Sequence, residues 1–234
     1  MAFPTSETRT DRDDRTGVLL TVGSDRTLTV SLIAELNGLC DRVEDSGGGG
    51  PVVIGVGGRS PNGSPAWPGT PEIHLVGKWE GALRRLERLS AAVVAVAQGH
   101  CTGPAAEVLL ACDYRIGTPD LALEVAGGAA SPWPGMALHR LANQVGVARA
   151  RSLVLFGGVV PAAQAVEIGV LDEVAEDVDA AVAVAHRAAR VTSGSELAMR
   201  RRLLLDATST SFEDALGAHL AACDRTLRRD QAAG

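Results

Sequence analysis

The stretch from Leu89 to Asp113 holds the residues whose types and spacing could do chemistry. It predicts a short buried strand over Val93 to Ala97, a tight turn with glycine, and an apolar helix that carries one carboxylate, Glu107. A strand that enters a helix through such a turn points backbone N–H groups at a ligand above the helix N-terminus, where the helix dipole favours negative charge. A thioester oxygen that gains charge during a reaction suits this geometry.

Four side chains in or beside this turn decide what it can do. Pro104 lies in the turn and has no N–H to offer. Glu107 is a candidate general acid or base, or else a carboxylate in water or at a subunit contact. Nothing nearby in the sequence would lower the pKa of the Cys101 thiol, so we expect no nucleophile there. His100 is most simply interpreted as a residue that fills the turn.

Composition limits the classes of function. The 234 residues suffice for one large domain, and 46% are apolar while only 3% are aromatic, so the core must be built from Ala, Val and Leu. A net charge of -6 argues against a nucleic-acid partner. No segment predicts a membrane span, and the polar, charged first residues favour a cytoplasmic protein. The four cysteines show no paired spacing, and no pattern of His, Cys and Asp suggests a metal.

Hydrophobic periodicity predicts strands that alternate with helices, followed by helices alone. The predicted strands are Val18–Val22, Thr27–Val30, Pro51–Val56, Val93–Ala97, Tyr114–Ile116, Ala122–Val125 and Leu171–Val174. Besides the helix of Glu107, the predicted helices are Ser31–Glu44 with Ser31 as N-cap, Lys78–Arg88, Met136–Phe156 with a break near Gly146, Ala162–Ile168, Val178–Val191, Ser195–Leu205 and Phe212–Arg229. We therefore expect an α/β fold with a parallel sheet: a flexible tail at 1–15, a core at 16–190, and a C-terminal helical oligomerisation region at 191–234.

Three motifs in order resemble those of the crotonase (enoyl-CoA hydratase/isomerase) family. They are G-H-C-T-G-P-A-A-E-V-L-L-A-C-D-Y-R-I, P-G-M-A-L-H-R-L and A-A-Q-A-V-E-I-G-V-L-D-E-V, and the resemblance spans roughly residues 18 to 229. It implies the ClpP/crotonase-like fold, a spiral of ββα units with a C-terminal helical portion. Members usually form trimers or dimers of trimers, bind acyl-CoA as substrate or ligand, and need no other cofactor.

The resemblance also implies a degenerate oxyanion hole. In this family two backbone N–H groups hold the thioester oxygen. The second donor matches Pro104, which has none, and the loss of one donor typically costs about 3 kcal/mol of transition-state stabilisation. Gly103 could supply a neighbouring N–H only if the turn shifted. The first donor matches Ser64 or Pro65, and the register leaves both open.

The family's proton-transfer groups are only partly retained. The first catalytic carboxylate matches Glu107, whereas the position of the second matches Gly127. Glu124 lies three residues earlier and could substitute only from a different angle. Arg59 matches a position near the coenzyme A phosphates, although a solvated charge explains it equally well. The family's C-terminal extension, which closes over the coenzyme, looks shortened. Ordinary two-carboxylate hydration is therefore not expected.

The combination of a small crotonase-like chain and a defective site is similar to one subgroup, the enoyl-CoA hydratase-like proteins of 3,5-dihydroxyphenylglycine biosynthesis in actinomycete producers of glycopeptide antibiotics. That similarity implies a helper of a type III polyketide synthase and a second, more complete crotonase homologue, which together form 3,5-dihydroxyphenylacetyl-CoA. Two functions stay open: a non-catalytic partner in a homo- or hetero-oligomer, and a dehydratase that acts on a CoA-bound intermediate through Glu107.

Overall fold

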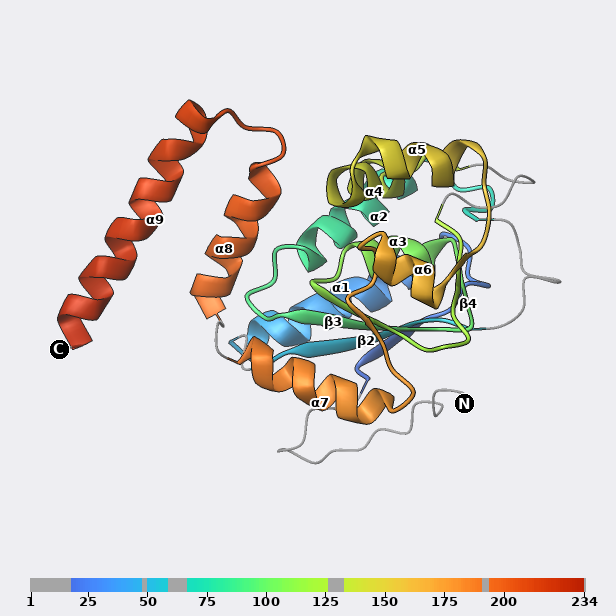
Figure 1. Cartoon of the computed structure of the whole chain (residues 1–234), viewed down its shortest axis with the longest axis horizontal. Coiled ribbons are helices and arrows are strands. Elements are labelled where there is room, and N and C mark those ends of the chain that lie inside the picture. Colours follow the sequence, from blue (N-terminus) through green and yellow to red (C-terminus); the bar gives the residue numbers. More distant parts are fainter. Residues whose placement is uncertain (1–17, 48–49, 59–66, 126–132, 191–193, 234) are drawn as a thin grey trace.

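A parallel sheet forms the centre of the molecule (Figure 1). The computed structural model describes residues 18–47, 50–58, 67–125, 133–190 and 194–233. Within these ranges the main sheet has five strands, all parallel, in the order β1 (Leu20–Val22), β2 (Val52–Gly57), β3 (Val93–Gln98), β5 (Tyr114–Gly117) and β8 (Glu173–Val174). A smaller sheet pairs β6 (Ala122–Leu123) with β4 (His100–Cys101) and β7 (Val160–Pro161). The predicted α/β class is confirmed.

Helices cover both faces of this sheet. In chain order they are α1 (Val30–Asp45), α2 (Ile73–Leu86), α3 (Pro104–Leu110), α4 (Ala137–Val145), α5 (Val147–Leu155), α6 (Ala162–Glu167), α7 (Val178–Ala189), α8 (Gly194–Asp206) and α9 (Phe212–Ala233). Successive side chains of a strand point to opposite faces. Val53 and Val94 therefore pack against Val182 of α7, whereas Ile54 and Ala95 belong to the larger core that α1, α2 and α3 cover.

The start of α1 differs from the prediction. The Leu32 N–H donates to the Thr29 hydroxyl at 3.2 Å, so Thr29 is the N-cap and the helix begins at Val30. The predicted strand at Thr27–Val30 and the predicted N-cap at Ser31 are both wrong, because the Thr29 hydroxyl caps the helix two residues earlier, and threonine is also a favoured N-cap residue. The apolar stripe through Leu32 lies buried as predicted.

Two other predictions concern helix ends. α2 begins at Ile73, five residues before the predicted Lys78, because the helix starts directly after Glu72, its N-cap residue. The predicted break near Gly146 is confirmed: this glycine adopts φ +82° and separates α4 from α5. Residues that carry a side chain rarely adopt a backbone conformation with this positive φ, so glycine is the residue expected there.

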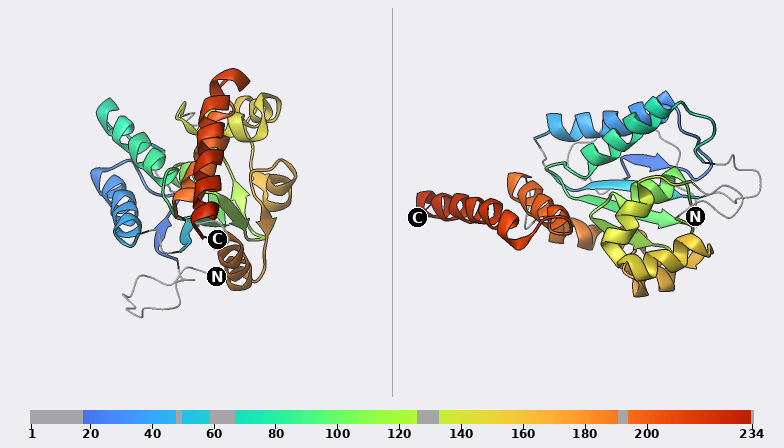
Figure 2. Two further views of the ribbon diagram at one scale, coloured as in Figure 1. Left: turned by 90° about the vertical axis from the view of Figure 1, so that its left-hand side faces the viewer. Right: turned by 90° about the horizontal axis from the view of Figure 1, so that it is seen from above.

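Helices α8 and α9 form an arm that extends away from the sheet (Figure 2). One side chain of α8, Arg201, ties the arm to the core. Its guanidinium donates to the Asp113 carboxylate, with Nε 2.6 Å from Oδ1, and to the carbonyls of Leu89 and Ala91. Asp113 in turn accepts the Val93 N–H at 2.8 Å. The arm is therefore anchored at the start of the central strand β3.

Much of the arm's apolar surface is exposed. The larger examples are Leu204, Phe212, Leu220 and Leu227, whose exposed fractions lie between 58% and 76%. Such a surface suits a contact with another chain, as expected for an oligomerisation region at 191–234.

That region and the core boundary at 190 stay predictions, and the predicted tail at 1–15 lies outside the described residues. Among the helices described, none is long and apolar enough to cross a membrane.

We expect Arg201→Met to loosen the arm. The Arg201 side chain is 8% exposed and that of Asp113 29%, so removing the ion pair should cost about 2 kcal/mol of unfolding free energy, between the values of exposed and buried pairs. Hydrogen exchange should accelerate in α8 and α9 and stay unchanged in α1. Arg200→Met is the matched control, because among the described residues Arg200 pairs with Glu196 of its own helix and with no residue of the core. Equal exchange in both variants would show that Arg201 does not anchor the arm.

Candidate functional site

Glu107 lies in the interior with both carboxylate oxygens occupied. It is the fourth residue of α3, and 2% of it is exposed. The indole N–H of Trp67 donates to Oε1 at 3.0 Å and that of Trp79 to Oε2 at 2.5 Å. The two indole rings meet edge to face, with centroids 5.7 Å apart. A carboxylate so buried must be hydrogen-bonded or protonated, and these two donors meet part of that need.

The third tryptophan of the chain also lies beside this carboxylate. A Cβ built on Gly135 would lie 2.4 Å from Nε1 of Trp133 and 3.0 Å from Oε1 of Glu107. A side chain at position 135 would therefore collide with both Trp133 and Glu107, so glycine is required there. The chain contains only three tryptophans, and Trp67, Trp79 and Trp133 all surround Glu107. We call these four residues the tryptophan–glutamate cluster.

Burial changes the acidity of Glu107. It raises the pKa of this carboxyl to about 7, because the interior solvates the charged form poorly. The hydrogen bonds from Trp79 and Trp67 favour the charged form and lower the pKa in part, and the charges of Glu80 and Arg140 act in opposite directions. Near neutral pH the carboxyl is thus present in both forms, as a proton donor or acceptor requires.

The turn before α3 joins a glycine of positive φ to a proline, so it lacks one backbone N–H at the start of the helix. Gly103 is the N-cap residue with φ +55°, and Pro104 is the first helical residue, where it brings no N–H. Trp67 packs directly on the turn, since a Cβ on Gly103 would lie 3.0 Å from the Trp67 Cβ. The same indole therefore covers the turn and binds Glu107.

The remaining predicted site residues fall into two groups. Four of them lie outside the described residues, and for these the predictions stand untested: Arg59, Ser64, Pro65 and Gly127. The others are described. His100 Nε2 lies 3.6 Å from Oε2 of Glu124, too far for a hydrogen bond, so the two side chains form an ion pair only when the imidazole is protonated. Cys101 is fully buried, and burial raises the pKa of its thiol to about 12, which makes it a poor nucleophile at neutral pH.

Comparison with known proteins shows which protein family has this sequence and fold. A sequence profile of the family described as enoyl-CoA hydratase/isomerase matches residues 74–232. An Amycolatopsis orientalis protein named enoyl-CoA-hydratase is 43% identical over 213 residues, covering 91% of this chain and 97% of its own. This chain belongs to the enoyl-CoA hydratase/isomerase family. The family that the three sequence motifs resemble is thereby confirmed.

Solved structures agree with the fold of this enoyl-CoA hydratase/isomerase family member. The Mycobacterium smegmatis enoyl-CoA hydratase gives a TM-score of 0.77 at 18% identity, covering 93% of this chain and 89% of its own. A putative enoyl-CoA hydratase from Streptomyces coelicolor gives 0.69 at 19% identity, covering 97% and 92%. The predicted crotonase fold is confirmed. At these identities the likeness concerns the fold alone.

The tryptophans of the cluster are functional candidates that the sequence analysis did not single out. Glu107 and the turn were predicted, but Trp67 comes from the Pro/Gly-rich stretch, Trp79 from α2 and Trp133 from the segment before α4. The available signal was compositional: three tryptophans in a chain with 3% aromatic residues. Within the described residues, no group of His, Cys, Asp and Glu is arranged to hold a metal ion.

The raised pKa of Glu107 predicts that this residue makes the protein less stable as the pH rises. The folded protein keeps a proton up to a pH of about 7, whereas the unfolded chain releases it near the ordinary value of 4.5. The contribution to stability is therefore complete below about pH 4.5 and is lost as the pH rises through 7, amounting to about 3 kcal/mol. Urea unfolding followed by circular dichroism, at several pH values, measures it.

Glu107→Gln isolates this effect from other groups that titrate. The amide directs an NH₂ group at one indole N–H, so the variant should be less stable than the parent near pH 5 by about 1 to 3 kcal/mol. That deficit should shrink or reverse by pH 8, because only the parent loses stability. Glu167→Gln, on the exposed side of α6, is the control. A stability difference independent of pH would contradict the buried, titrating carboxyl.

The two indole donors should have unequal effects on Glu107. Removing a hydrogen bond to the charged form raises a pKa, and the bond from Trp79 lowers the pKa of Glu107 more than the bond from Trp67 does. We therefore expect Trp79→Phe to raise this pKa further than Trp67→Phe. The titration of the Glu107 carboxyl carbon, followed by NMR, gives the three values directly. A pKa that falls in either variant would show that the indoles do not stabilise the carboxylate.

Proposed function

We propose that this chain is an auxiliary protein of 3,5-dihydroxyphenylglycine biosynthesis, a non-catalytic partner within the crotonase family. It assists a type III polyketide synthase and a second crotonase homologue in forming 3,5-dihydroxyphenylacetyl-CoA. The pathway and the partners rest on the sequence resemblance. The choice of a partner over an enzyme rests on the state of Glu107.

One observation carries this choice: the only oxygens that Glu107 could use in proton transfer already bind Trp67 and Trp79. A substrate would have to displace an indole from a side chain that is 2% exposed. The turn is weakened as well, because Pro104 brings no N–H to a developing oxyanion. Both features act against the same reaction: the turn stabilises charge on the thioester less well, and the carboxyl is not free to transfer a proton.

As a partner, the protein acts through differential affinity. It raises turnover if it binds the active form of the synthase or of the homologue more tightly than the inactive form, typically by 1 to 3 kcal/mol. The exposed apolar residues of α8 and α9 provide a surface for that contact or for self-association. An acyl-CoA bound by the chain would act as a ligand shared with its partners, and no other cofactor is required.

A second function is supported by a different observation, the pKa of about 7 at Glu107. A carboxyl that is partly protonated at neutral pH can donate a proton to a leaving hydroxyl. In this alternative the protein is a single-carboxylate dehydratase that removes water from a CoA-bound polyketide intermediate. The loss of water aromatises the ring, which is strongly downhill, so a weak oxyanion site could suffice. Trp67 would have to move first.

The two functions differ in what Glu107→Gln does. We reconstitute the synthase and the homologue with malonyl-CoA, add the parent protein or a variant, and measure 3,5-dihydroxyphenylacetyl-CoA. For a partner, the parent protein raises product formation and co-elutes with one of the two enzymes. Glu107→Gln, Pro104→Gly and the control Glu167→Gln should all retain the stimulation. The parent protein alone should not hydrate crotonyl-CoA.

Three results would contradict the proposal that the protein is a non-catalytic partner in this pathway. If Glu107→Gln abolishes the stimulation while it still folds and co-elutes, the dehydratase is correct instead. If the isolated protein hydrates crotonyl-CoA at a rate typical of enzymes, on the order of 10 per second, the turn tolerates Pro104 and the site is catalytic. If no product is stimulated and nothing co-elutes, the pathway assignment itself is wrong.

A further inference from the structure

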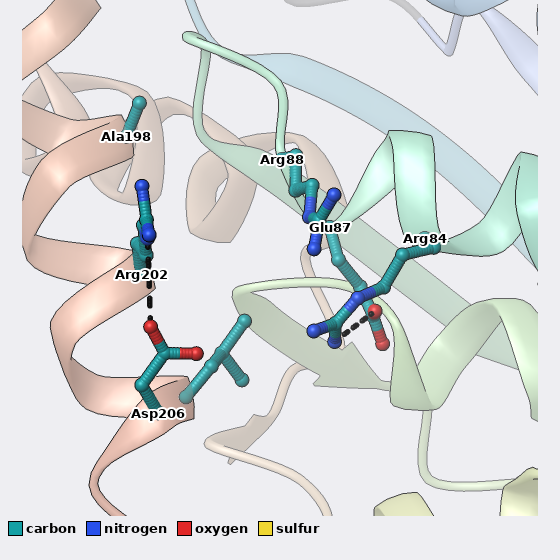
Figure 3. A pocket seen from close by; sticks show the side chains of 7 residues that line it. Arg84, Glu87, Arg88, Ala198, Arg202 and Asp206 are labelled. Atoms are coloured by element: carbon teal, nitrogen blue, oxygen red, sulfur yellow. Dashed lines mark hydrogen bonds and ion pairs between the residues drawn. The ribbon is translucent and has the colours of Figure 1, made fainter.

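A crevice of about 410 Å³, partly open to solvent, lies between the end of α2 and the first helix of the arm, α8 (Figure 3). This volume falls within the range of pockets that hold small molecules. Its walls come from two elements far apart in sequence: Arg84, Glu87 and Arg88 on the core side, and Ala198, Arg202, Leu205 and Asp206 on α8. We call it the arm cavity.

The arm cavity is separate from the turn at Gly103. Its core wall directly precedes β3, beside the carbonyls of Leu89 and Ala91 that Arg201 binds. The turn at Gly103 follows the other end of that strand. The six residues of β3 span about 20 Å. A ligand in the arm cavity therefore occupies a different site from a thioester held at the turn.

The three arginines of the arm cavity are weakly held by the protein itself. Arg88 is exposed and makes no hydrogen bond or ion pair with any described residue. Arg84 reaches Glu87 at only 3.4 Å, and Glu87 is held more closely by Arg140, whose Nε lies 2.6 Å from Oε1. Two guanidinium groups on the core side are thus available to an anion without the loss of a strong internal ion pair.

The wall on α8 adds three further kinds of contact. Arg202 lies 3.5 Å from Asp206, a loose pair one helical turn apart, so it too can turn toward an anion. The Asp206 carboxylate can accept hydrogen bonds from hydroxyl groups. Leu205 contributes an apolar surface.

We propose that the arm cavity binds a small phosphorylated molecule that also carries hydroxyl groups. Guanidinium groups bind phosphate oxygens through paired, charge-assisted hydrogen bonds, and Arg84, Arg88 and Arg202 line the two walls. The cavity is larger than inorganic phosphate requires, and its carboxylates favour a ligand with donors of its own. A sugar phosphate or a nucleoside monophosphate has this chemistry.

Such a ligand would also hold the arm in place. It contacts the core and α8 together, so it binds only while α8 is docked, and binding must stabilise the docked form. In this respect it acts in the same direction as the anchor at Arg201. The proposal goes beyond the proposed function, because it depends neither on Glu107 nor on a partner enzyme.

Calorimetric titration of the full chain at low salt tests the site, with ribose 5-phosphate and adenosine 5′-monophosphate as probes. At least one should bind, and more tightly than ribose or inorganic phosphate. Arg88→Gln and Arg202→Gln should each weaken binding about tenfold, which equals about 1.4 kcal/mol. Arg228→Gln is the matched control: like Arg202 it pairs with an aspartate four residues away, but it lies on α9 outside the cavity. Its affinity should be unchanged, and the bound probe should slow hydrogen exchange in α8.

Four results would overturn the proposal. Neither probe binds the parent protein at concentrations up to about 10 mM. The parent protein and the variants at Arg88 and Arg202 bind equally, so that the anion sits elsewhere. Arg228→Gln weakens binding as much as they do, which indicates a general effect of charge. Inorganic phosphate binds as tightly as the organic probes, so that the cavity does not recognise hydroxyl groups.

Discussion

A carboxylate buried in the interior constrains the segments of the chain that pack around it. Glu107 is almost fully removed from water, so the segments around it must deliver hydrogen-bond donors to the same place. Trp67 and Trp79 do so from before and within α2. Gly135 leaves room for the segment that leads into α4 to approach. Three separate parts of the chain thus meet at one buried carboxyl group.

The charges behind this cluster form a connected set. Arg140 of α4 lies between two carboxylates, one in α2 and one at its C-cap: its Nη1 is 2.9 Å from Glu80 and its Nε 2.6 Å from Glu87. Glu80 and Arg140 in turn act on Glu107 through space. Glu87 also lines the arm cavity. Two ion pairs between α2 and α4 therefore lie between the interior carboxyl and the wall of the arm cavity.

Much of the fold follows from local rules that a sequence displays. Alternating strands and helices, the break at Gly146 and the helix that carries Glu107 all depend on periodicity or on single residues with fixed backbone preferences. The N-cap at Thr29 was missed because two neighbouring hydroxyl residues, Thr29 and Ser31, both fit a helix start, and only the backbone decides between them.

Only part of the candidate site could be predicted from the sequence. The lack of an N–H at Pro104 is a property of one residue and needs no structure to state. The indoles around Glu107 come from positions 40 and 28 residues earlier, so only the tertiary fold brings them to the carboxylate. The anchor of the arm is of the same kind, since Arg201 meets Asp113 across 88 residues. Contacts over such separations leave no local pattern.

The gathering of all three tryptophans at Glu107 also determines what intrinsic fluorescence can reveal about this protein. Neither α8 nor α9 contains a tryptophan, so the indole emission reports on the core and on the environment of one carboxyl. An arm that detached from the core would scarcely change that emission, although loss of its helices would alter the far-ultraviolet circular dichroism. For this chain, agreement between the two optical signals during unfolding is itself a measure of how tightly the arm and the core are coupled.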